Sequence, residues 1–201
     1  CRALAEMAEI LKRKKEQKEL ESRAKQYALK MEELWSPEFG AYLNYRTDVD
    51  SLSTRVSPTL FYPLMAKVGN EEKNEKIMEH FYNPEEFYGE WMLPSTTRND
   101  PTFSRQRYWK GAIWPPLNFL TYLSLRQAGY TDAATELSEK SLKLIMTEWT
   151  RKGYVSENYS SITGTGDDSR LSSDRFHSWG ALFGIISFIE NGYLPKIESP
   201  M

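Results

Sequence analysis

Residues 113–152, IWPPLNFLTYLSLRQAGYTDAATELSEKSLKLIMTEWTRK, decide the fold class because they read as two helices joined by one tight turn. In the first helix, apolar and small residues recur at three- and four-residue steps, and two prolines are tolerated in the first turn. Gly129 is expected to end this helix, and Thr131 to cap the next one. The inner stripe predicted for the second helix is Ala134, Leu137, Ser141, Ile145 and Trp149. The stretch therefore predicts an α-helical hairpin.

Upstream of this hairpin, residues 3–34 have the periodicity of one long helix. The charge run at 12–16 within it is typical either of a solvated face or of a break between two helices. Pro37 disfavours helical backbone at the residue before it and so ends the pattern. Residues 39–46 are too short and too aromatic for a helix, so a short strand or an extended loop is expected there.

Two more helices are predicted before residue 83. Ser57 precedes Pro58, which indicates an N-cap and a proline at the first helical position, for a helix that reaches about Lys67. Gly69 ends that helix, and another runs from residue 70 or 71 to about Phe81.

The remaining segments alternate between loop and helix. Residues 83–110 and 160–175 read as loops, and a last helix starts near Trp179 and ends at 191–192. The apolar residues of this last helix are Trp179, Leu182, Phe183, Ile186 and Ile189. The fold class is therefore all-α, built of helical hairpins with short strands or extended loops at one end.

Composition narrows the classes of partner and cofactor. The 201 residues carry a net charge of -2 and a single cysteine. This charge favours neither a nucleic acid nor an anionic membrane as partner, and no apolar run approaches the roughly 20 residues of a membrane span. His80 and His177 lack the spacing of a zinc motif, so neither a metal site nor a cofactor is predicted. The chain starts Cys1-Arg2-Ala3-Leu4, directly in a helical pattern, so we expect part of a longer protein and infer no compartment.

Among the carboxylates, Glu157 has the least ordinary surroundings. It lies just after a predicted helix C-terminus, with Asn158 beside it and a tyrosine on either side, at 154 and 159. An isolated loop glutamate is usually a solvated charge, but tyrosine and amide groups can orient a carboxylate and restrict its water. Cleavage of a glycoside uses two carboxyl groups, one as acid and one as base or nucleophile. Glu157 is therefore the leading catalytic candidate.

The order of three motifs resembles glycoside hydrolase family 63 and its trehalase-like relatives. Residues 108–118, YWKGAIWPPLN, are similar to the family's Tyr-Trp-Arg-Gly-Pro-x-Trp segment. Glu157-Asn158-Tyr159, the pair Gly164 and Gly166, and then 176–182, FHSWGAL, follow in the family's order. The first motif is fairly specific and Glu-Asn-Tyr alone is weak, but their ordered combination is strong. The similarity covers roughly residues 25–192.

This resemblance implies an inverting glycosidase with an (α/α)6 toroid, of which residues 1–201 would form a single C-terminal domain portion. The substrate would be an α-linked gluco- or manno-oligosaccharide, and no cofactor is needed. Glu157 would be the general base. The residues implied to contact the substrate are Trp109, Lys110, Trp114, Asn118, Tyr159, His177 and Trp179. For Trp114 and Trp179, simple packing between helices is the alternative.

Two departures from the family pattern have consequences. Lys110 stands where the family usually has arginine, and a lysine cannot make the bidentate contacts of an arginine. The family's general acid belongs to the earlier half of the barrel, and neither Asp48, Asp50 nor Asp100 lies in a segment that resembles the acid's motif. About seven helices are too few for a closed toroid of six helical hairpins, so we expect an exposed apolar edge. Either the missing N-terminal half of the barrel covers this edge, or two copies associate through it.

Two other functions fit less well. A catalytically inactive carbohydrate-binding relative would keep the aromatic residues without needing Glu157. A helical interaction module would show tandem repeats of a fixed period, and the sequence shows only paired helices with unequal loops.

Overall fold

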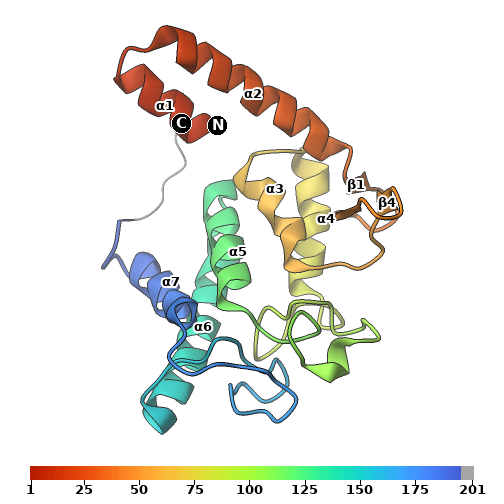
Figure 1. The fold of residues 1–201 in the computed structure, drawn as a ribbon, viewed down its shortest axis with the longest axis vertical. Coiled ribbons are helices and arrows are strands. Elements are labelled where there is room, and N and C mark those ends of the chain that lie inside the picture. Colours follow the sequence, from red (N-terminus) through yellow and green to blue (C-terminus); the bar gives the residue numbers. More distant parts are fainter. Residues whose placement is uncertain (196–201) are drawn as a thin grey trace.

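The computed structural model describes residues 1–195, and it is dominated by α-helices with two small β-ladders (Figure 1). The helices are α1 (Arg2–Ile10), α2 (Lys14–Glu32), α3 (Tyr62–Met65), α4 (Glu71–Tyr82), α5 (Pro115–Ala128), α6 (Thr131–Lys152) and α7 (Leu182–Glu190). The strands are β1 (Trp35–Ser36), β2 (Ala41–Tyr42), β3 (Tyr45–Arg46) and β4 (Ser51–Leu52). Both ladders, β1-β2 and β3-β4, are antiparallel. The expected all-α class is confirmed.

The hairpin that decides the fold class is α5 followed by α6. Pro115 occupies the first turn of α5, where its missing N–H costs nothing. Gly129 takes a left-handed φ of 84°, and the next amide donates to the carbonyl of Leu125, so the helix closes as a glycine C-cap. The expected cap at Thr131 is wrong: Thr131 is already the first helical residue, and its hydroxyl donates to the carbonyl of Gly129.

The buried stripe of α6 differs from the predicted one near its C-terminal end. Leu137 and Ser141 are buried as expected, but Trp149 is 51% exposed and Glu148 is buried instead. The stripe therefore runs through Leu144 and Glu148, one residue earlier than the apolar pattern suggests. The reason is that Glu148 has ion-pair and hydrogen-bond partners at the end of α6 and in the loop beyond it, which permits its burial.

The predicted helix at 3–34 is broken, as the charge run allowed. α1 ends at Ile10, and Lys12 has a φ of 57°, so the chain reverses and α2 packs against α1. No residue of α2 is buried, and the α1-α2 hairpin extends along one side of the body (Figure 1). Large exposed apolar residues on this hairpin are Leu4, Met7, Ile10, Leu11, Tyr27 and Leu29.

The segment expected to be one helix from 58 to about 67 starts as a 3₁₀ turn, Pro58–Phe61, and continues as the short α3. Ser57 does not cap it through its side chain, because its hydroxyl contacts Asn44 and Thr59 instead. The α4 helix starts where expected and does have a side-chain cap, since the Asn70 side chain accepts from the amide of Lys73.

A hydrophobic core joins the helices. Phe61 packs edge-to-face on Phe81 and Phe87, and Tyr122 of α5 and Phe183 of α7 are fully buried in the same cluster. Outside the α1-α2 hairpin, α3 packs on α5, α5 on α6, and α6 on α7. Stacking successive hairpins in this way leaves the long loops together at one end, around the start of α5 (Figure 1).

A partly buried titratable pair, His80 and Glu86, ties the β1-β2 hairpin to α4. His80 Nδ1 contacts the Glu86 carboxylate, and its Nε2 lies 2.8 Å from the carbonyl oxygen of Phe39. Burial alone would lower the pKa of His80, but the hydrogen bond and charge of Glu86 outweigh it and hold that pKa above its ordinary value.

No helix within residues 1–195 is long and apolar enough to cross a membrane.

Candidate active site

Three chain segments meet beside the N-terminus of α5 and form an irregular ladder. Ile113 exchanges two backbone hydrogen bonds with Tyr159, at 2.7 and 3.0 Å, and pairs on its other side with Pro94. The amide of Ser95 donates to the carbonyl of Ala112 at 2.9 Å. This ladder brings the loop before α5, the start of α5 and the Glu157 segment to one place.

Glu157 is fixed through its backbone. Its amide donates to the carbonyl of Asp174 at 2.8 Å, and its carbonyl accepts from the Trp179 indole N–H at 3.1 Å. The carboxylate, by contrast, is held loosely: Oε2 lies 3.5 Å from the amide of Asp174 and Oε1 lies 3.9 Å from His177 Nε2. The side chain is 17% exposed. Glu157 is thus rigidly placed, and its oxygens keep room for further hydrogen bonds.

Aromatic rings form a continuous row next to this carboxylate. Trp109 stacks on Trp114 with centroids 4.1 Å apart and planes at 25°, and Trp114 meets Trp179 edge-on at 5.9 Å. The His177 ring lies 4.3 Å from that of Trp179. Trp114 is fully buried, whereas Trp109 is 44% exposed. The row therefore has a buried centre and an open end, which suits stacking against the apolar face of a sugar ring.

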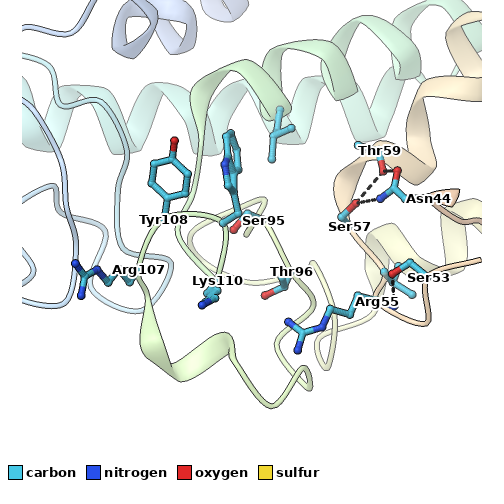
Figure 2. Close-up of a pocket in the computed structure, with 13 residues that line it drawn as sticks. Asn44, Ser53, Arg55, Ser57, Thr59, Ser95, Thr96, Arg107, Tyr108 and Lys110 are labelled. Atoms are coloured by element: carbon cyan, nitrogen blue, oxygen red, sulfur yellow. Dashed lines mark hydrogen bonds between the residues drawn. The ribbon is translucent and has the colours of Figure 1, made fainter. Parts of the chain in front are cut away.

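Lys110 lines a cavity of about 480 Å³ beside Trp109 (Figure 2). The cavity also receives Arg55 and Arg107, and Lys110, Thr96 and Arg55 converge on one region of it. Within residues 1–195, neither Lys110 nor Arg107 forms an ion pair. Positive charge at the cavity is therefore in excess.

Two buried residues, Ser95 and Thr96, form part of the wall of this cavity. Both residues line it, both are more than nine-tenths buried, and both hydroxyl oxygens have no hydrogen-bond partner among the described residues. Because both hydroxyl oxygens are themselves shielded from solvent, they lie within the wall of the cavity rather than open to it.

Besides Trp114, two residues expected to contact the substrate are fully buried beneath the site. Asn118 accepts from the amide of Leu93 at 2.6 Å and donates to the carbonyls of Leu93 and Trp114. Tyr159 accepts from the amide of Ser156 at 3.1 Å, and burial raises its pKa to about 12. In this structure both support the backbone around the site and neither reaches its surface.

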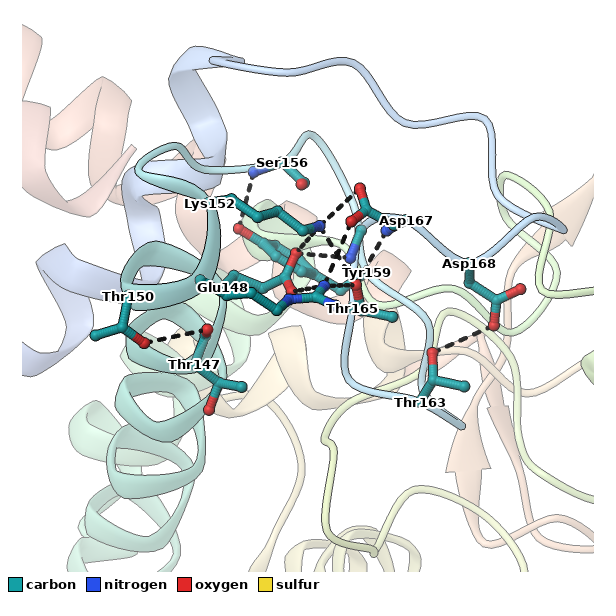
Figure 3. Close-up of polar contacts among 12 residues, drawn as sticks. Thr147, Glu148, Thr150, Lys152, Ser156, Tyr159, Thr163, Thr165, Asp167 and Asp168 are labelled. Atoms are coloured by element: carbon teal, nitrogen blue, oxygen red, sulfur yellow. Dashed lines mark hydrogen bonds and ion pairs between the residues drawn. The ribbon is translucent and has the colours of Figure 1, made fainter.

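A charged cluster that the sequence did not indicate anchors the loop after Glu157 to α6 (Figure 3). Glu148 accepts from Arg151 at 2.7 Å, from the amide of Gly166 at 2.9 Å and from Lys152, which also contacts Asp167 at 2.7 Å. Burial alone would raise the pKa of Glu148, but these donors outweigh it and hold the pKa below its ordinary value.

The predicted glycine pair serves close packing. A Cβ at Gly164 would lie 2.3 Å from the Trp91 ring, and a Cβ at Gly166 would lie 2.1 Å from the Ser156 hydroxyl. The loop can approach Trp91 at Gly164, and the Glu157 segment at Gly166, only because these positions lack a side chain. Among residues 1–195, no group of three or more histidine, cysteine or acidic side chains is arranged to hold a metal ion.

Comparison with known proteins gives concordant matches. Residues 1–179 match the model of the mannosylglycerate hydrolase MGH1-like glycoside hydrolase domain. The mannosyl-oligosaccharide glucosidase of Saccharomyces cerevisiae is 31% identical over 128 residues, which are 56% of this chain and 15% of that protein. Mannosylglycerate hydrolase MGH1 of Selaginella moellendorffii is 29% identical over 112 residues, 53% of this chain and 20% of that protein.

Among solved structures, the GH63 mannosylglycerate hydrolase of Thermus thermophilus in complex with glucose superposes with a TM-score of 0.75 at 23% identity. The alignment covers 92% of this chain and 44% of that one, and it shows a shared fold of (α/α)6 type. The chain thus spans less than half the length of these relatives. The match over residues 1–179 shows that the chain belongs to the family of mannosylglycerate hydrolase MGH1-like glycoside hydrolase domains.

Proposed function

We propose that this chain supplies the general-base half of the active site of an inverting glycoside hydrolase, with Glu157 as the base. The observation that carries the proposal is the position of Glu157, whose backbone carbonyl binds the indole of Trp179 in the Trp109–Trp114–Trp179 row. The row would hold a sugar ring, and the carboxylate would lie where a water molecule can reach the anomeric carbon.

The geometry suits a base better than a structural ion pair. Backbone bonds fix Glu157, yet its two oxygens have only a 3.5 Å hydrogen bond and a 3.9 Å contact with His177 among the described residues. An attacking water can therefore donate a hydrogen bond to the carboxylate without displacing a strong partner. In the proposed single step, Glu157 takes the proton of this water while an acid protonates the departing oxygen.

We place the general acid in a part of the protein that precedes residue 1. The sequence of 1–201 holds no acidic residue in the acid's motif, and the relatives are more than twice as long as the matched segment. Inversion requires the two carboxyl groups to be roughly 6.5–9.5 Å apart, so that a water fits between one of them and the sugar. A structure of the full-length protein would measure this separation directly.

The test compares the full-length protein with its Glu157→Gln variant on a panel of α-linked glucosides and mannosides. Turnover should fall at least ~10²-fold while substrate binding is retained. Glu139→Gln is the matched control, because Glu139 is an exposed residue on α6. Proton NMR of the first product should show the β-anomer. Unchanged turnover in Glu157→Gln would remove this residue from the mechanism, and binding without any wild-type turnover would indicate an inactive carbohydrate-binding relative.

A substrate with an acidic aglycone is favoured by the cavity beside Trp109. Arg55, Arg107 and Lys110 all line it, and among the described residues only Arg55 of the three has an ion-pair partner, Asp100 at 3.7 Å. This is the chemistry that binds a carboxylate such as the one glycerate carries, in keeping with the mannosylglycerate hydrolases among the relatives.

Substrate charge is tested by pairing mannosylglycerate with methyl α-mannoside. Lys110→Ala should raise the KM for the charged substrate about tenfold, the loss of one charge-assisted hydrogen bond, and leave the uncharged one unchanged. An equal effect on both substrates would assign Lys110 to the sugar itself, and a neutral oligosaccharide would then be the better substrate class.

The exposed apolar residues of α1 and α2 are proposed to lie against the remainder of the barrel, or against a second copy when the remainder is missing. Sedimentation of the 201-residue chain alone should show association. A monodisperse, protease-resistant monomer would contradict this proposal.

A further inference from the structure

Gln106 links the turn that carries Trp109 and Lys110 to the segment that carries Glu157. Its side chain is fully buried, although it lies between two arginines in the sequence. A buried primary amide is rare unless its oxygen and nitrogen both have hydrogen-bond partners, and here both do.

The hydrogen bonds of Gln106 reach both the turn and the Glu157 segment. Its Nε2 donates to the carbonyl of Phe103 at 2.9 Å and to the Ser161 hydroxyl at 3.0 Å. Its Oε1 accepts from the amide of Ser161 at 2.9 Å, and this bond to an obligatory donor fixes which end of the amide is oxygen. The Ser161 hydroxyl in turn donates to the carbonyl of Gly111 at 2.7 Å.

The turn from 106 to 111 needs such support. Gln106, Tyr108 and Gly111 have φ values of 48°, 54° and 90°, and two of the three are not glycine. Left-handed backbone at residues with a side chain persists only where the surroundings impose it. A Cβ at Gly111 would lie 2.6 Å from Gln106 Nε2, so the amide is packed directly against the turn.

The backbone pairing between the two segments lies outside the turn, which is tied to the start of α5 by the Trp114 indole N–H, a donor to the carbonyl of Tyr108 at 2.9 Å. Ile113 and Tyr159 are paired through the backbone, but that pair lies at the base of the turn, next to α5. Beyond it, the amide of Gln106 and the hydroxyl of Ser161 are the contacts that reach Phe103 and Gly111.

We propose that Gln106 is a positioning residue, which sets the distance between the ligand-facing turn 107–111 and the Glu157 segment. This inference rests on the proposed glycosidase function only for its effect on turnover. The predicted consequence is that the loss of the amide displaces Trp109 and Lys110 relative to the carboxylate, while the helical core stays folded.

The experiment uses the full-length protein and the variants Gln106→Met, which keeps the side chain's length without its hydrogen bonds, and Ser161→Ala, in case the first fails to fold. Tyr122→Phe is the control, because it removes one buried hydrogen bond, to Glu190, about two helical turns along α5 from Trp114. We expect kcat/KM to fall at least ~10-fold in Gln106→Met and less than about twofold in Tyr122→Phe.

A purely structural role is separated from positioning by a double-mutant cycle with Lys110→Ala. If Gln106 acts by placing the turn, the two losses in kcat/KM will be strongly non-additive, whereas Tyr122→Phe and Lys110→Ala will add. Additive losses for Gln106→Met and Lys110→Ala, or unchanged turnover in both Gln106→Met and Ser161→Ala, would overturn the inference.

Amide hydrogen exchange decides the inference without any need for turnover. Gln106→Met should lose protection in peptides covering 104–114 and 156–163 and retain it in α5 and α6. If the wild type has no glycosidase activity but this pattern appears, the proposed function fails and the positioning link stands. If protection in both peptides is unchanged, the link itself is refuted.

Discussion

Replacing Glu148 by glutamine tests whether its buried charge cluster holds the loop that follows the Glu157 segment. The Glu148 side chain is 1% exposed and accepts from Lys152, Arg151 and the amide of Gly166. Removing one partner of a buried ion pair usually costs about 3–5 kcal/mol. The cost here should be nearer ~2–4 kcal/mol, because Lys152 keeps Asp167 at 2.7 Å and Arg151 is half-exposed.

The loss should be visible as a fall in Tm of about 5–15 °C, since 1 kcal/mol shifts a domain of this size by roughly 2–4 °C. Urea unfolding of wild type and Glu148→Gln gives the free energy of unfolding, and Glu90→Gln is the matched control. Glu90 pairs with Lys143 at 3.0 Å, but both side chains are more than half exposed. Its loss should cost less than about 1 kcal/mol.

The effect should also depend on pH in a defined direction. The folded pKa of Glu148 is lowered, so the unfolded chain binds its proton more readily than the folded one. The stability that ionised Glu148 contributes is present above the ordinary glutamate pKa and is lost as the pH falls through the folded pKa. The stability difference between wild type and Glu148→Gln should therefore shrink in acid. A loss equal to that of Glu90→Gln, or one independent of pH, would refute the role given to this cluster.

Further predictions concern other parts of the molecule. The pKa of His80 is raised in the folded protein, so the stability that protonated His80 contributes is full below about pH 6.5 and is lost as the pH rises through the folded pKa. In urea unfolding, His80→Gln should therefore show a flatter dependence of stability on pH above about pH 6.5. Gly166→Ala should cost about 1–3 kcal/mol and lower kcat/KM by displacing Ser156 next to the proposed base. Gly129→Ala has open space at φ 84° and should cost about 1–2 kcal/mol with kcat/KM unchanged. Trp109→Ala should weaken sugar binding in calorimetry by about 0.5–1.5 kcal/mol and lower the Tm only slightly, because that indole is 44% exposed and its lost contact is the stack on Trp114.

Helix positions were readable from the sequence where local chemistry alone determines them. The α5-α6 hairpin has prolines at its start and a glycine at its turn, and both act through the backbone of their own segment. The sequence does not decide whether the helix breaks at Lys12, because a charge run is compatible with either a continuous or a broken helix. The choice depends on α1 packing against α2, which is a tertiary contact.

Polar residues with distant partners were not readable. Gln106 sits in an Arg-Gln-Arg run that looks solvated, and its partner Ser161 is 55 residues away. Glu148 likewise falls beside the apolar stripe of α6, and its burial depends on the amide of Gly166, 18 residues further on. In both cases the sequence shows a polar group, and only the fold shows the donors that permit its burial.

A motif shared with a family does not by itself distinguish residues that contact a ligand from those that support the site. Trp109 and Asn118 belong to the same motif, residues 108–118, yet one lies open at the end of the aromatic row and the other is fully buried. Asn118 lies one helical turn after Trp114, so its amide points inward and binds the backbone of Leu93. Helical phase therefore explains why Asn118 lies beneath the site, whereas Trp109 and Lys110 precede α5 and are free of it. If Trp109 contacts the ligand as proposed, Asn118→Ala should reduce stability and activity together, whereas Trp109→Ala should act mainly on ligand affinity.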